Sequence, residues 1–225
     1  MYKTEPHLHT DEGSPCGKIP AKELVRLHAE AGYTTILVAD HFGVDVVERI
    51  AAPDWAKTVK CFFAGYYAAL EVAPQYGMYI LPSPEFAFPG NPNHYLAVGA
   101  GPDFFLAHPE LADITLSALH ALLNENGLIL VQAHPFRGAR CTPDPHNVDG
   151  LEVLNSHPRH YNPLHTEAAL QIAKIYNLPI TAGSDTHRPE DVARTGVYSE
   201  QPITSVEEYM QFLKDGLLTP IPVSE

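Results

Sequence analysis

Residues 178–187 read LPITAGSDTH, an apolar run that ends in small and polar residues. The run favours a buried strand bounded by turn residues. Asp185 and His187 follow it at spacing i, i+2, which places two side chains on the same side of an extended chain. Capping of a following helix by Ser184 or Asp185 is the alternative interpretation. The stretch predicts a strand that delivers a carboxylate and an imidazole to its C-terminal end.

The same arrangement recurs along the chain. Apolar runs occur at 34–40, 78–86, 94–100, 127–134 and 150–157, and segments of helical period occur at 20–32, 55–77, 115–127, 162–177 and 205–216. This alternation is typical of βα units. Polar side chains stand at or just past the ends of the runs, namely Asp40, His41, Glu85, His134 and His157. Because strand ends converge at the mouth of a parallel barrel, we expect an α/β barrel with its site there.

A further pair of histidines lies near the N-terminus. Residues 5–17 read EPHLHTDEGSPCG, with His7 and His9 two residues apart. If residues 2–8 form a first strand, both imidazoles point to one side and can share a metal ion. An isolated pair could equally be surface or core histidines. The coincidence with the other strand ends favours a metal site.

The composition limits the class of protein. The 225 residues are 45% apolar, which suits one domain over residues 1–225, and no linker or repeat divides them. A net charge of -13 disfavours a nucleic-acid partner. Three cysteines, an odd number, favour a reducing compartment, and no apolar stretch is long enough for a membrane span. We therefore expect a cytoplasmic protein, with no indication of its oligomeric state.

The candidate residues suggest a chemistry. Histidine and carboxylate ligands suit zinc, manganese or iron. The candidates exceed the three or four ligands that one ion needs, so we expect two or three divalent ions. Adjacent ions generate hydroxide from water and clamp a phosphoryl group. The predicted reaction is hydrolysis of a phosphate ester, in which metal-bound hydroxide attacks phosphorus.

Taken in order, the motifs resemble one family. They are HLHT (7–10), AGYTTILVADH (31–41), PSPEFAF (82–88), NHYLAVG (93–99), QAHPFR (132–137) and AGSDTHRPEDV (182–192). The chain is similar to the polymerase and histidinol phosphatase (PHP) superfamily, in particular to small stand-alone metal-dependent phosphoesterases. The resemblance implies a distorted, TIM-like (βα)7 barrel with a metal cluster at the C-terminal mouth of its strands.

The resemblance also implies a set of metal ligands. One ion would be held by His7, His9, Glu85 and Asp185, and Glu85 would bridge to a second ion held by His94 and His134. A third would take His41, His187 and one ligand from the loop after His9. In that loop this chain departs from the family, because Pro15 and Cys16 stand where a His or Asp is common. Cys16, Asp11 or Glu12 could supply the ligand, or the third site could be weak or empty.

The positions of further polar residues along the sequence suggest roles in metal binding, substrate binding and catalysis. His108 competes with His94, which precedes its apolar run instead of ending it. Asp40 is expected to orient a ligand from outside the metal shell. Guanidinium groups match phosphate, although surface ion pairs are the alternative for each arginine. We predict that the substrate is bound by Arg137, Arg188, His157 and Arg159, and that the catalytic residues are His41, His134, His187, Arg137 and Arg188.

The leading hypothesis is a phosphomonoesterase of the EC 3.1.3 type. Its substrate would be a small phosphorylated metabolite, such as histidinol phosphate, a nucleotide or a sugar phosphate. One alternative is a phosphodiesterase or exonuclease acting on a nucleic acid or oligonucleotide, against which the acidic composition argues. Another is a non-catalytic, metal-binding regulatory domain, in whose favour only the altered loop at Cys16 speaks.

Overall fold

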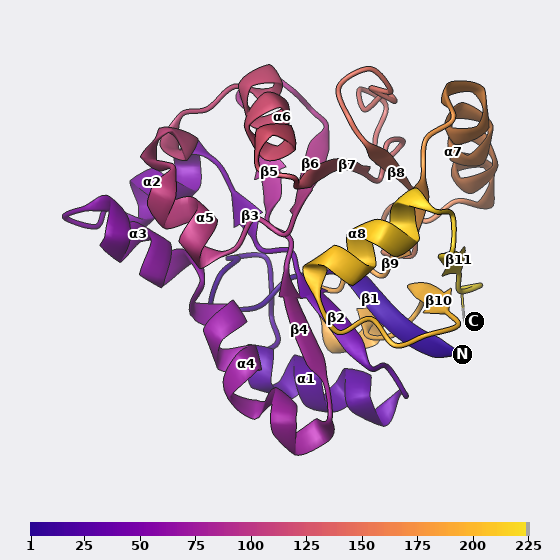
Figure 1. The fold of residues 1–225 in the computed structure, drawn as a ribbon, viewed down its shortest axis with the longest axis horizontal. Coiled ribbons are helices and arrows are strands. Elements are labelled where there is room, and N and C mark those ends of the chain that lie inside the picture. Colours follow the sequence, from indigo (N-terminus) through magenta and orange to yellow (C-terminus); the bar gives the residue numbers. More distant parts are fainter. Residues whose placement is uncertain (224–225) are drawn as a thin grey trace.

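The computed structural model describes residues 1–223 and contains two β-sheets surrounded by helices (Figure 1). In spatial order the first sheet consists of β11 (Thr219–Pro220), β10 (Val197–Ser199), β1 (Tyr2–Leu8), β2 (Thr35–Val38) and β4 (Tyr79–Pro82). The second consists of β3 (His41–Phe42), β5 (Glu85–Ala87), β6 (His94–Val98), β7 (Ile129–Ala133), β8 (Gly150–Asn155) and β9 (Ile180–Gly183).

The two sheets adjoin at β1 and β9. Leu8 forms a parallel bridge with Thr186, and the His9 amide donates to the Thr186 carbonyl over 2.9 Å. At the other side of the first sheet, β4 leads through Ser83 and Pro84 directly into β5 of the second. The strands therefore wrap into a distorted, TIM-like α/β barrel, which confirms the predicted fold class.

One strand accounts for much of the distortion. Strand β6 runs antiparallel to both of its neighbours, with His94 opposite Ala87 of β5 and Ala133 of β7. The pairs β1 with β2, β2 with β4, β7 with β8 and β8 with β9 are parallel, as a barrel requires. Because β6 is reversed, its first residue lies at the mouth where the other strands end.

Helices pack around the sheets. They are α1 (Ala21–Glu30), α2 (Val44–Ile50), α3 (Trp55–Phe62), α4 (Ala64–Tyr76), α5 (Pro102–Ala107), α6 (Leu116–Glu125), α7 (Pro163–Tyr176) and α8 (Val206–Lys214), with short 3-10 turns η1 (Pro109–Ala112) and η2 (Pro189–Asp191). Side chains of Asp54, Thr115 and Ser205 accept backbone hydrogen bonds at the starts of α3, α6 and α8. The predicted helix over 55–77 is divided at Phe63 into α3 and α4. No helix within residues 1–223 is both long and apolar enough to cross a membrane.

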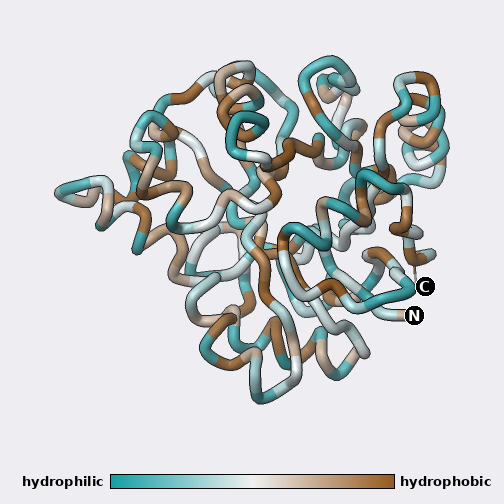
Figure 2. Tube along the Cα trace, in the orientation of Figure 1, coloured by the Kyte–Doolittle hydropathy of each residue, from teal (hydrophilic) through white to brown (hydrophobic). Residues whose placement is uncertain are grey.

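The core lies between the strands and the helices. Leu37, Leu96 and Val131 of the sheets pack with Tyr209 and Leu213 of α8. A second cluster is rich in phenylalanine, and the Phe42 ring packs edge to face with Phe62, Phe86 and Phe105. Figure 2 shows the corresponding hydropathy, with apolar residues along strands such as β4 and β7 and polar residues on the outer turns. This packing fixes the strand ends that carry the polar cluster.

Candidate metal centre

Histidine and carboxylate side chains from distant segments converge at the mouth of the barrel. Within each of four overlapping groups of three, the potential metal-binding atoms lie within 4.8 Å of one another. The groups are formed by His7, His9, His41, Glu85, His94, His134, Asp185 and His187. The structure thus brings together every candidate ligand from the strand ends and from the start of β6.

Glu85 lies at the centre of this cluster and is fully buried. Its Oε1 is 2.9 Å from His134 Nε2 and 3.0 Å from His94 Nδ1. Its Oε2 lies 2.7 Å from His41 Nδ1 but makes no hydrogen bond of good geometry. Burial alone would raise the pKa of Glu85, but the surrounding histidines hold it well below its usual value. Glu85 is therefore a carboxylate with an oxygen available to a cation.

The spacing of the donor atoms fits a bound ion. His7 Nε2 lies 3.2 Å from His9 Nε2, and Asp185 Oδ1 lies 3.4 Å and 3.1 Å from these two nitrogens. Glu85 oxygens are 3.7 Å and 3.6 Å from the same nitrogens. Ligands held at about 2.0–2.1 Å by a tetrahedral ion are about 3.4 Å apart. The donor set and its dimensions therefore suit a divalent cation.

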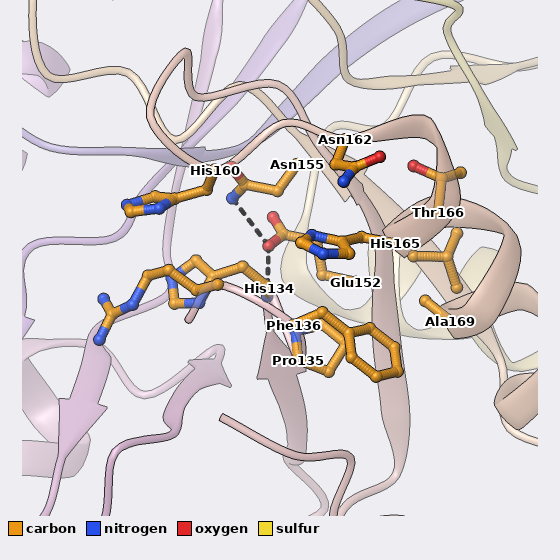
Figure 3. A pocket seen from close by; sticks show the side chains of 12 residues that line it. His134, Pro135, Phe136, Glu152, Asn155, His160, Asn162, His165, Thr166 and Ala169 are labelled. Atoms are coloured by element: carbon orange, nitrogen blue, oxygen red, sulfur yellow. Dashed lines mark hydrogen bonds between the residues drawn. The ribbon is translucent and has the colours of Figure 1, made fainter. Parts of the chain in front are cut away.

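Glu152 of β8 orients the first histidine from behind. Its Oε1 lies 2.9 Å from His7 Nδ1, which leaves His7 Nε2 directed into the cluster. Its Oε2 accepts from the His134 amide at 2.8 Å and from Asn155 Nδ2 at 3.0 Å, the two bonds drawn in Figure 3. Glu152 is not among the residues predicted from the sequence. Its signal is a single acid within the apolar strand GLEVLN, where an unpaired charge would be costly.

The backbone is strained at two candidate ligands. His134 has φ of 30° and Asp185 has φ of 53°, in a region that residues with a side chain rarely occupy. Such strain is often found where a side chain must be aimed precisely. Beside them, a Cβ on Gly183 would lie 2.5 Å from His7 Cβ, so only glycine allows β9 to approach β1 this closely.

The loop after β1 brings Cys16 to the cluster. Asp40 holds the loop by accepting from Thr10 N at 2.8 Å and from Thr10 Oγ1 at 2.7 Å. Asp40 thus contacts the loop and not a histidine ring. Burial raises the pKa of the Cys16 thiol, but the nearby His187 and His41 rings outweigh burial and lower the pKa to about 6.

The other candidates from this loop face elsewhere. The Glu12 carboxylate accepts from the Ala21 amide at the start of α1, with the nearer oxygen at 3.0 Å. Asp11 is exposed. Of the three predicted alternatives, the structure brings only Cys16 into contact with His41 and His187.

The reversed strand distinguishes His94 from His108. His94 contacts Glu85, whereas His108 Nδ1 pairs with Glu110 at 3.0 Å, outside the cluster. Arg137 lies against the His94 ring, with Nη2 at 3.0 Å from His94 Nε2. The structure therefore places His94 and Arg137 at the cluster.

A cavity of about 160 Å³ lies directly over the cluster. It is lined by His41, His134, Arg137, His157, Arg159, His160, Asp185 and His187. His157 Nδ1 accepts from the Arg159 amide at 3.2 Å, so a neutral His157 carries its proton on Nε2. Arg188 is exposed and is not part of this lining. We call the 160 Å³ cavity, which Arg137 and Arg159 line, the cationic cavity.

Comparisons with known proteins agree with the fold. A family model described as PHP-associated matches residues 163–216. A search of curated proteins found no match. A two-domain protein from Bacteroides vulgatus containing a predicted PHP-like metal-dependent phosphoesterase is 16% identical, with a TM-score of 0.68 over 99% of this chain and 65% of that one.

Two further structures are similar. A protein from Bifidobacterium adolescentis, proposed to be a metal-dependent phosphoesterase, is 17% identical, with a TM-score of 0.60 over 96% of both chains. The lesion-specific endonuclease PfuEndoQ from Pyrococcus furiosus is 13% identical, with a TM-score of 0.59 over 95% of this chain and 56% of that one. The family model covers α7 to α8, and the structural matches show the fold along nearly the whole chain. These matches show that the chain shares its fold with a protein containing a predicted PHP-like metal-dependent phosphoesterase, and that its residues 163–216 resemble a PHP-associated segment.

Proposed function

We propose that the protein is a metal-dependent phosphoesterase, and specifically a phosphomonoesterase acting on a small phosphorylated metabolite. The observation that carries the proposal is the position of the cationic cavity directly over the cluster. Asp185, His134 and His187 belong to both. A phosphate group in this cavity would therefore contact arginines on one side and the candidate metal ligands on the other.

The residues suggest how zinc, manganese or iron ions would be held. His7, His9, Glu85 and Asp185 would bind one ion, and Glu85 would share a second with His94 and His134. His41, His187 and Cys16 would bind a third. Ions in such a site lower the pKa of water and offset the charge on a phosphoryl group.

Residues of the cationic cavity would position the phosphate. Arg137 and Arg159 form no ion pair with any carboxylate among residues 1–223, so no acidic side chain neutralises them. Arg137 also contacts the His94 ring, and its charge would still attract phosphate oxygens. His157 would donate from Nε2. Burial lowers the pKa of His157, which keeps the ring neutral near pH 7. These three side chains would hold the phosphate and fix its orientation.

Charge supports a monoester over a nucleic acid. The chain has 14 basic and 27 acidic residues, and a polyanion would be repelled by much of its surface. The likeness to an endonuclease makes a phosphodiesterase the second candidate. The two activities share the cluster and differ in the substrate that the cavity accepts.

A matched pair of substrates tests the proposal. Purified protein is loaded with manganese, its metal content is measured, and p-nitrophenyl phosphate is compared with bis-p-nitrophenyl phosphate. We expect hydrolysis of the monoester. Hydrolysis of the diester alone would establish the phosphodiesterase instead. Bound metal without hydrolysis of any phosphoester in a wider screen would indicate a regulatory domain.

A further inference from the structure

A second cavity lies beside the cluster. Its volume is about 390 Å³, and His41 and His94 form the wall that it shares with the cluster. Small-molecule sites in proteins range from about 300 to 1,000 Å³. His41 also lines the cationic cavity, so the two cavities adjoin on either side of this ring.

The lining of the second cavity differs from that of the first. Phe42, Val46 and Ala87 give it an apolar surface, and Asp45 and Arg49 of α2 add one negative and one positive charge. A phosphate held by Arg137 and Arg159 would leave the remainder of a substrate room on this side.

Asp45 and Arg49 are not engaged with each other. They stand at i and i+4 on one helix, a spacing at which opposite charges commonly pair. Within residues 1–223, neither side chain forms an ion pair, and the one hydrogen bond of Arg49 is a long contact of 3.4 Å to the Gly13 carbonyl. Both charges therefore remain available at the cavity wall.

We propose that this cavity binds the alcohol portion of the substrate, and that this portion resembles an amino acid. Its carboxylate would pair with Arg49 and its ammonium with Asp45, while its carbon chain would lie against Phe42 and Val46. This inference rests on the proposed phosphomonoesterase function, since it places the phosphate in the cationic cavity. It deepens that function by naming the substrate class, an O-phosphorylated zwitterion.

Three phosphonates that cannot be hydrolysed test the inference by binding alone. Propylphosphonate carries neither charge, 4-phosphonobutanoate adds the carboxylate, and 2-amino-4-phosphonobutanoate adds the ammonium. Their dissociation constants are measured by calorimetry on the manganese-loaded protein. A hydrogen bond to a charged group contributes enough for about a 10- to 100-fold gain in affinity. We expect 2-amino-4-phosphonobutanoate to bind at least about 10-fold more tightly than propylphosphonate.

Substitutions assign each charge. Arg49→Met should abolish the gain in affinity from the carboxylate, and Asp45→Asn should abolish only the gain from the ammonium. Lys60→Met on α3 removes one positive charge outside the cavity and is the control, which should leave the affinity ranking intact. Because Asp45 and Arg49 are exposed, both variants should fold, and circular dichroism checks this.

The inference fails if the three phosphonates bind equally, if none binds, or if Arg49→Met weakens all three alike. The proposed function is tested separately by hydrolysis of p-nitrophenyl phosphate. A protein that hydrolyses this ester but does not rank the phosphonates would keep the function and lose the inference. A protein that binds the phosphonates in the expected order but hydrolyses no p-nitrophenyl phosphate would support the inference and contradict the proposed function.

Discussion

Glu152 Oε1 lies 2.9 Å from His7 Nδ1, and both side chains are buried. The carboxylate fixes the histidine in the tautomer that carries its proton on Nδ1. The opposite nitrogen is then free to bind a cation, which is the arrangement found behind many metal-binding histidines. A residue that would touch no ion thereby determines how a ligand is aimed.

Glu152→Gln should weaken metal binding by about 10- to 100-fold, because the amide holds the His7 ring less firmly and in a less defined tautomer. Competition with a coloured chelator measures the affinity. Glu167→Gln removes an exposed acid from α7 and is the matched control. Equal affinities in the two variants would show that Glu152 does not position His7.

The two competing histidines give a second comparison. His94→Ala should reduce the metal content of the purified protein, because it removes a donor 3.0 Å from Glu85. His108→Ala should leave it unchanged, since His108 pairs with Glu110. Elemental analysis after dialysis measures both. His7→Ala, Glu85→Ala and Asp185→Ala should each reduce the content as well, and unaltered content in all of them would refute the assigned cluster.

Cys16→Ser tests the third ion. If the thiolate is a ligand, the variant should retain one ion fewer per chain, whereas Cys61→Ser should retain the full number. In metal-free protein, alkylation that depends on Cys16 should rise through pH of about 6, the pH range in which its lowered pKa produces thiolate. Metal should then protect Cys16 from iodoacetamide. Unchanged ion numbers would mean that the loop does not complete a site.

The raised pKa of Glu5 should make the stability of the metal-free protein depend on pH. Burial raises the pKa of Glu5 to about 8, although amide donors from Ser184 and His7 oppose this. In the unfolded chain the carboxyl ionises near its ordinary pKa, so between that value and about 8 the folded state binds more protons. The free energy of unfolding should therefore fall as pH rises through this window, and level off above it.

Denaturant unfolding at a series of pH values measures this slope. Glu5→Gln should flatten it, because the amide does not titrate, and Glu200→Gln, at an exposed position, should keep it. A slope that is identical in wild type and Glu5→Gln would show that Glu5 does not control it.

The sequence was sufficient to predict the fold class because the strands are recognisable as short apolar runs. Apolar runs such as 178–183 end sharply in ligand-type residues, and a parallel barrel brings such ends together. The convergence of His7, His9, Glu85, Asp185 and His187 could be expected for this reason. Their roles as ligands are proposals, which the variants of His7, Glu85 and Asp185 test directly.

Other features depend on tertiary relationships that a linear pattern does not contain. His94 precedes its run, and only the reversed direction of β6 places it at the mouth. Arg137 and Arg188 both follow a candidate ligand directly, yet Arg137 turns toward His94 while Arg188 remains exposed. The contact of Glu152 with His7 becomes visible only once β8 is placed next to β9, which in turn lies against β1.

The reversed β6 also has an evolutionary consequence. After β1, β3, β6 and β8 the next element is a helix, which a longer loop would displace. The turn over residues 88–93 instead joins two strands that are held in register by the pairing of Ala87 with His94. Insertions in this turn can reshape the entrance without displacing Glu85 or His94. It is the part of the rim that can change in length and shape at least risk to the histidine and carboxylate cluster.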